Sequence, residues 1–193
     1  MRGDPFKISF IAFCAALNVG IAFLVQLLKL PIYLDSVGTV LAAVLIGPIS
    51  GAVAGVLALL IITITTAPTA IAYSCTAVVI AVCSSFFTRF KFLANIWASI
   101  FGGFLLGVIS ALVSAPVTVY VFHGATLVGA DMFTVLFKAT GRPLLESAIL
   151  GGLATDPVDK VATSLLCFFL IKALPARLTS HFAGSRILSA KSE

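Results

Sequence analysis

This 193-residue sequence has few charged residues. Only 10% of its residues are Asp, Glu, Lys or Arg, whereas an ordinary soluble domain has about a quarter. Hydrophobic residues make up 61% of the chain, and the mean hydropathy is +1.20. Several apolar runs approach the length of about 20 residues that a helix needs to cross a bilayer. A single hydrophobic core in a chain of this size could not bury all of these runs. The composition excludes a soluble globular domain and predicts an all-α membrane protein with a single membrane domain over residues 1–193.

Residues for catalysis and metal binding are also scarce. The chain has two histidines and contains no HExxH, GxSxG, Walker or paired acidic motif. Its cysteines lie within apolar runs without CxxC spacing, so we interpret them as packing residues: Cys14, Cys75, Cys83 and Cys167. We therefore predict no enzymatic activity, no ATP hydrolysis by this chain alone, no metal site and no cofactor.

The net charge of +5 does not indicate a nucleic-acid partner. The basic residues occur singly or in pairs, without the basic stripe that phosphate backbones require. Membrane orientation explains their distribution better, because cytoplasmic segments of membrane proteins are rich in Lys and Arg.

The apolar runs predict about six transmembrane helices, at approximately 8–28, 35–46, 49–66, 69–87, 93–122 and 157–174. The second helix is the shortest, so it must either be short or begin nearer Pro31. Pro116 provides a place for a kink in the long fifth helix.

Residues 123–156 are predicted to form an outer loop that contains an amphipathic segment. Met132, Val135, Leu136 and Ala139 recur there at helical spacing among charged residues. This pattern is typical of a helix that lies in the membrane interface.

Six crossings place both termini on one side of the membrane, and the charge distribution indicates which side. With the termini inside, eight of the twelve basic residues are cytoplasmic, while the outer segments carry five acidic residues. We therefore predict that both termini are cytoplasmic.

This topology gathers polar residues at the outer ends of the helices. Ionisable residues at membrane depth are costly unless they face protein or water, which makes them functional candidates. The candidate substrate-binding residues are Tyr33, Asp35, Tyr73, Tyr120, Arg142, Glu146, Asp159 and Lys160.

Structural roles are open for several of these residues. Asp35, followed by Ser36, could cap the second helix, and Asp156 could cap a helix that starts at Pro157. The tyrosines could belong to the aromatic belt at the membrane surface. None of these roles excludes ligand binding.

Small residues recur at four-residue intervals in three helices. Gly47, Gly51 and Gly55 form one such series, and Gly103 and Gly107 form another. Small residues at this spacing let helices approach closely in lipid, so we expect these glycines in internal packing. Ala12 and Ala16 have the same spacing in the first helix.

Three segments together resemble a known family. The sequence "LDSVGTVLAAVLIGPISGAVAG", the sequence "DPVDKVATSLLCFFLIKALPARL" and the AxxxA motif at Ala12 and Ala16 are similar to the substrate-binding S components of energy-coupling factor (ECF) transporters. These proteins import vitamins into prokaryotic cells, and the likeness covers nearly the whole chain.

The resemblance implies a function and partners. An S component in the prokaryotic plasma membrane captures a vitamin or vitamin precursor from outside, in a pocket under the loop between its first two helices, here "KLPIYLD". A membrane coupling protein contacts the small residues of the first helix, here Ala12 and Ala16, and two separate ATPases supply the energy. The whole S component topples in the membrane to release its ligand.

Two other classes are open. One is a stand-alone small secondary carrier or membrane enzyme, which would need acid or base pairs at mid-depth. The other is a membrane assembly subunit that binds no ligand, in which the outer charges only cap helices. The outer carboxylates, Arg142, Lys160 and the tyrosines suit a small polar ligand with an aromatic ring.

Overall fold

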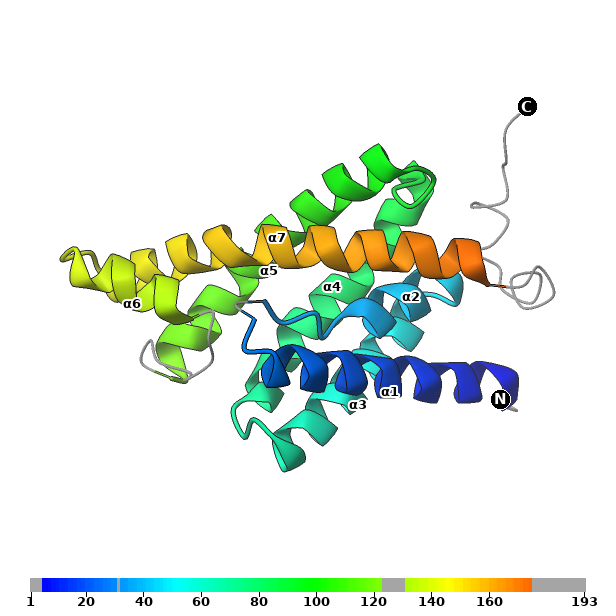
Figure 1. The fold of residues 1–193 in the computed structure, drawn as a ribbon, viewed down its shortest axis with the longest axis horizontal. Coiled ribbons are helices and arrows are strands. Elements are labelled where there is room, and N and C mark those ends of the chain that lie inside the picture. The colour runs from blue at the N-terminus through cyan, green and yellow to red at the C-terminus, as the bar shows by residue number, and fades with distance from the viewer. Residues whose placement is uncertain (1–4, 31, 123–130, 175–193) are drawn as a thin grey trace.

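A computed structural model describes residues 5–30, 32–122 and 131–174 of the chain. Every regular element in these ranges is helical, with no strand among them (Figure 1). The α-helices are α1 (Pro5–Leu27), α2 (Val37–Leu45), α3 (Pro48–Thr65), α4 (Ser74–Phe87), α5 (Ile96–Tyr120), α6 (Asp131–Ala139) and α7 (Leu144–Ala173). Two short 3₁₀ helices, η1 (Ala70–Tyr73) and η2 (Thr88–Phe90), flank α4.

Four helical stretches are long and apolar enough to cross a membrane. They are Pro5–Leu27, Pro48–Thr65, Ala70–Phe90 and Ile96–Tyr120. The prediction of an all-helical chain with membrane-spanning character is confirmed at this level. Each stretch differs from its predicted range by only a few residues at either end.

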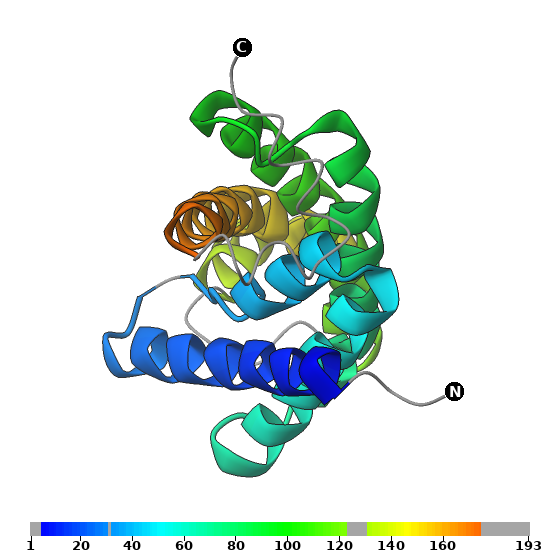
Figure 2. The same cartoon turned by 90° about the vertical axis from the view of Figure 1, so that its right-hand side faces the viewer.

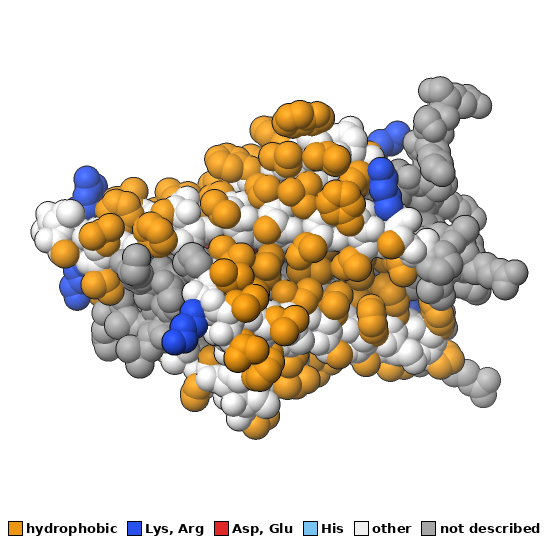
Figure 3. All heavy atoms as spheres, in the orientation of Figure 1, with side chains coloured by type: hydrophobic (Ala, Val, Ile, Leu, Met, Phe, Trp, Pro, Cys, Tyr) orange, Lys and Arg blue, Asp and Glu red, His pale blue; other side chains and the backbone are white. Residues whose placement is uncertain are grey.

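The surface of the molecule is apolar and its interior is partly polar. Figure 3 shows hydrophobic side chains over the middle of the face in view, with Lys and Arg side chains mostly toward the ends of the long axis. Ile64 is 83% exposed, whereas Asn18, Asp159 and Lys160 are buried. A water-soluble protein has the opposite preference, so this distribution suits lipid as the surrounding solvent.

The helices form a bundle around α2. The start of α1 and the end of α7 lie at one end of the long axis, and α6 lies at the other (Figure 1). Seen along that axis, α2 lies between α1 and α7 (Figure 2). It contacts α1, α3, α4 and α7, and all nine of its residues are buried.

The second helix is shorter than predicted. It spans Val37–Leu45, or about 14 Å at 1.5 Å per residue, in place of the predicted 35–46. Residues 32–36 precede it as non-helical chain. At the other end, Gly47 adopts a φ of +142°, which favours glycine, and Pro48 then begins α3.

The last helix begins earlier than predicted, and the prediction that Asp156 caps it is wrong. Helix α7 starts at Leu144, directly after its N-cap Pro143, and continues through Pro157. Thus residues 144–156 belong to a helix and not to a loop. At Pro157 the helix packs closely on Gly107 of α5, where a Cβ atom would lie 2.4 Å from the Pro157 Cα.

The segment predicted to be amphipathic coincides with the helix α6. Val135 and Leu136 are more than half exposed, at 54% and 58%, while Thr134 is buried against Gly151 of α7. The helix thus turns a hydroxyl inward and its apolar residues outward, as expected for a helix in the membrane interface.

Glycines mediate the close helix contacts. The predicted packing role is confirmed for Gly51, Gly55, Gly103 and Gly107 and is wrong for Gly47, which has nothing within 4 Å of its Cβ position and serves the turn before α3. A Cβ atom on Gly38 would lie 1.9 Å from the Cys14 carbonyl oxygen of α1. One on Gly51 would lie 2.6 Å from the Ala43 Cβ of α2, and one on Gly107 would lie 2.4 Å from the Pro157 Cα of α7. None of these positions has room for a side chain without movement of the helices.

This packing predicts different effects for two chemically identical changes. Gly107→Ala should lower the free energy of unfolding by about 1–3 kcal/mol, because backbone atoms of α7 must move away. Gly20→Ala should be neutral or slightly stabilising, because nothing lies within 4 Å of its position and alanine favours helix. Thermal midpoints of both variants in one detergent measure the difference, and equal midpoints would contradict this account of the α5–α7 contact.

Candidate ligand-binding site

A cavity of about 840 Å³ lies inside the bundle, lined by the segment before α2, by the chain around η1 and by residues of all seven α-helices. This volume is in the range of sites for small organic ligands, roughly 300–1,000 Å³. Its lining includes many polar side chains: Gln26, Lys29, Tyr33, Asp35, Ser36, Thr39, Thr66, Thr69, Tyr73, Thr76, Ser110, Ser114, Thr118, Thr134, Thr155, Asp156 and Lys160.

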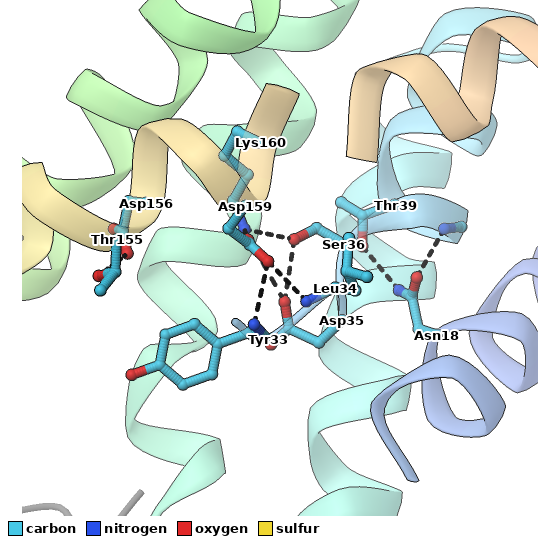
Figure 4. Close-up of polar contacts among 11 residues, drawn as sticks. Asn18, Tyr33, Leu34, Asp35, Ser36, Thr39, Thr155, Asp156, Asp159 and Lys160 are labelled. Carbon is cyan, nitrogen blue, oxygen red and sulfur yellow. Dashed lines mark hydrogen bonds and ion pairs between the residues drawn. The ribbon is translucent and has the colours of Figure 1, made fainter. Parts of the chain in front are cut away.

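The carboxylate of Asp159 fixes the segment before α2 (Figure 4). Its Oδ1 accepts hydrogen bonds from the backbone amides of Tyr33, at 3.0 Å, and Leu34, at 2.7 Å. Asp159 is fully buried. Non-helical backbone away from water needs partners for its amides, and here a side chain 125 residues further along the chain supplies them.

The ammonium of Lys160 forms an ion pair with the Asp159 carboxylate. Its ammonium donates to Oδ2 of Asp159 and, at 2.8 Å, to the hydroxyl of Ser36. The Ser36 hydroxyl in turn donates to Oδ1 of Asp35 at 2.9 Å, and this oxygen lies 3.9 Å from the ammonium. The residues from Tyr33 to Ser36 are therefore held to α7 by three hydrogen bonds and by the ion pair between Asp35 and Lys160.

These contacts correct the capping role considered for Asp35. The N-cap of α2 is Ser36, and no side chain caps the helix. The Asp35 carboxylate instead accepts from Ser36, faces Lys160 and lines the cavity. It is 31% exposed, so it remains accessible from the cavity.

Two further buried hydrogen bonds join α1 to α2. The side chain of Asn18 donates to the Thr39 hydroxyl at 2.9 Å and accepts from the Gly38 amide at 2.6 Å. Asn18 is fully buried, and Thr39 lines the cavity. An amide in an otherwise apolar helix is the sequence signal for this contact.

Hydroxyl groups form another wall. Ser110, Ser114 and Thr118 repeat every four residues along α5 and all line the cavity, as do Thr155 and Asp156 of α7. The Tyr73 hydroxyl bonds to Thr118 at 2.9 Å, and its ring stacks on Phe122 with centroids 5.9 Å apart. Tyr73 thereby offers the cavity an aromatic surface with a fixed orientation.

The structure brings together five of the eight predicted site residues. Tyr33, Asp35, Tyr73 and Lys160 line the cavity, and Asp159 stands behind them, bonded to Lys160. Tyr120 is 76% exposed and lies outside the lining. Arg142 and Glu146 pair with each other, half exposed, also outside it. His123 lies outside the described residues.

Sequence reasoning missed Asp156 as a cavity residue because it assumed that Pro157 begins a helix. Asp156, Asp159 and Lys160 have the spacing of one helical face, and the helix continues through the proline. This spacing of charged residues is the sequence signal that could have identified Asp156. No comparable sequence signal indicated that the hydroxyls of α5 line a cavity, since serine and threonine are common in membrane helices.

Ala12 and Ala16 lie far from this cavity, on the exposed face of α1. Gly20 continues the same four-residue interval and is also exposed. A shallow apolar groove lined by Ala16 and Gly20 runs along this face. The small residues of α1 are therefore not used in the internal packing of the described chain, unlike the glycines of α3 and α5.

No protein family model, curated protein or solved structure matches this chain. Its function has to be inferred from the site itself.

The buried ion pair predicts an asymmetry between single and double substitution. Asp159→Ala should lower the free energy of unfolding by about 3–5 kcal/mol, because two buried amides lose their acceptor and the buried Lys160 ammonium keeps only the Ser36 hydroxyl and the more distant Asp35 carboxylate. Adding Lys160→Met should recover part of this loss, because it removes the unpaired charge. Chemical unfolding of the purified variants measures both effects.

The matched control is the exposed pair of Arg142 and Glu146. Glu146→Gln should change the unfolding free energy by about 1 kcal/mol or less, because solvent screens that pair. A loss in Asp159→Ala no larger than the loss in Glu146→Gln would show that Asp159 does not anchor the segment before α2.

Proposed function

We propose that the chain is the membrane-embedded substrate-binding subunit of an ECF-type importer, which captures a water-soluble vitamin or vitamin precursor from outside the cell. The observation that carries the proposal is the polar cavity inside an apolar-surfaced helical bundle, covered by a non-helical segment that Asp159 holds in place. A site of this kind suits selective capture of a small polar molecule from water.

The proposal includes six membrane crossings. Helix α7 carries too many charges for an apolar span, but Asp156, Asp159 and Lys160 are buried inside the bundle and away from lipid. The short α2 makes its crossing together with residues 32–36, and irregular backbone is tolerated at membrane depth where it lines a cavity. The start of α1 and the end of α7 share one end of the bundle, which the charge bias assigns to the cytoplasm of a prokaryotic cell.

The proposal also includes an ECF module as partner. The exposed small residues Ala12, Ala16 and Gly20 form a smooth face on which a helix of the membrane coupling protein can pack closely. The coupling protein in turn joins two ATPases, which hydrolyse ATP to drive uptake.

One observation favours a second candidate, a stand-alone secondary carrier. Such a carrier needs ionisable groups in the interior of its helices, and Asp156, Asp159 and Lys160 are buried within α7. Uptake into liposomes separates the two candidates. The carrier would transport its substrate alone, whereas the importer subunit would need the ATPases and ATP.

The topology predicts the accessibility of two introduced cysteines, in a chain whose exposed Cys75 is replaced by serine. A cysteine at Thr140, in the exposed turn between α6 and α7, should react in whole cells with a membrane-impermeant thiol reagent. One at Lys91, in the exposed turn between α4 and α5, should react only after the membrane is opened. The reverse pattern would invert the orientation and move the cavity to the cytoplasmic side.

The function predicts that binding and assembly can be separated. Native mass spectrometry of the purified chain should detect a bound small molecule. Ala16→Leu should keep this molecule but reduce co-purification with the coupling protein and ATPases, because the larger side chain holds the helices apart. Phe13→Leu, a change on the same exposed side of α1 that adds no bulk, is the control. Loss of the small molecule together with intact assembly would contradict the separate roles of the two surfaces.

A further inference from the structure

The charges around the cavity do not balance. Asp35, Asp156 and Lys160 line it, and Asp159 lies directly behind Lys160. When all four groups are ionised, three carboxylates face one ammonium, which leaves two negative charges. Lys29 also contributes to the lining, but it lies in the exposed turn after α1 and remains in contact with solvent. The interior of the cavity is therefore anionic.

Asp156 has no direct ion pair in the described ranges, and the Lys160 charge one helical turn away acts on it only at longer range. Asp156 is 6% exposed. Its polar neighbours are the Ser110 hydroxyl and the Thr155 hydroxyl, which lies 3.5 Å away. The Thr155 hydroxyl also donates to the Gly151 carbonyl at 3.1 Å, and its single hydrogen cannot serve both acceptors.

A buried carboxylate that faces a cavity is stabilised by a positively charged partner. Asp159 already has such a partner in Lys160, and Asp35 shares it at longer range. For Asp156, the direction that offers space for a cation is the cavity. An anionic ligand would instead meet repulsion from both Asp35 and Asp156.

The rest of the lining fits an organic cation. A volume of about 840 Å³ greatly exceeds what an inorganic ion fills. The Ser110 and Ser114 hydroxyls can accept N–H donors near Asp156, and the Tyr73 ring presents an aromatic surface that attracts cations.

We infer that the cavity selects a small organic cation, a protonated amine or amidine-like nitrogen base with an aromatic ring, and that its charged nitrogen lies beside Asp156. This inference rests on the proposed function only in requiring that the cavity binds a ligand. It names the charge and the chemical class of that ligand, which the proposed function leaves open.

Three probes of nearly equal shape and different charge test the inference: benzamidine (cation), benzamide (neutral) and benzoate (anion). Each is titrated into the purified full-length chain in detergent, with binding measured by calorimetry and by the shift in thermal midpoint. Benzamidine should bind at least tenfold more tightly than the other two, because a charged hydrogen bond to a buried group contributes about that much. This order in the unmodified chain does not depend on any variant folding.

Asp156→Asn should abolish the preference for benzamidine and leave the affinity for benzamide within about threefold. Glu146→Gln, which removes an exposed carboxylate outside the cavity, should keep the preference. Benzamide or benzoate binding as tightly as benzamidine would overturn the inference, and so would the absence of any binding by the three probes. The proposed function is judged separately, by the molecule that co-purifies. A neutral or anionic molecule found there would overturn the cation and leave ligand capture intact.

Discussion

A single carboxylate, that of Asp159, holds the segment before α2 in the interior of the bundle. Two backbone amides of that segment donate to one of its oxygens, and the Lys160 ammonium donates to the other. Non-helical backbone that is shielded from water needs such a partner for its amides, because lipid offers no hydrogen bonds. The cost of burying the carboxylate is offset only because all three donors are present together. The position of this cavity-lining segment therefore depends on two adjacent residues of α7, Asp159 and Lys160.

The rest of the bundle is arranged so that this polar group never meets lipid. Helix α2 is buried on every side, and glycines on α3 and α5 bring their helices against α2 and α7. The apolar residues of α6 face outward while Thr134 faces α7. Side chains that would be buried in a soluble protein cover the outside, and the hydroxyls, carboxylates and ammonium are inside. A cavity lined by these groups can exchange hydrogen bonds with a ligand that has left water.

The polar cavity and the exposed small residues of α1 lie on different parts of the chain, and the proposed function gives them the separate roles of ligand capture and partner assembly. The cavity is formed by the segment before α2 and by one end of the helices, whereas Ala12, Ala16 and Gly20 lie on the outward face of α1. Asn18, on the buried side of α1, bonds to Thr39 and Gly38 of α2, and Ala22, Val25 and Gln26 of the same helix line the cavity.

The sequence by itself determined the helical class, the membrane-spanning character, the positions of the four long apolar helices and the packing role of most of the glycines, because hydrophobic run length and small-residue spacing are local properties. It also identified Asp35, Tyr73, Asp159 and Lys160 as candidates, since charge and tyrosine are rare in such a chain. Only the tertiary structure showed that α7 continues through Pro157, where it packs against Gly107 of another helix, because a proline in a sequence more often marks a helix start or break. For the same reason, it alone placed Asp156 in the cavity and Tyr120, Arg142 and Glu146 outside it. Whether a polar residue caps a helix, pairs on the surface or faces a cavity depends on neighbours more than a hundred residues away, as the bonds from Tyr33 and Leu34 to Asp159 show.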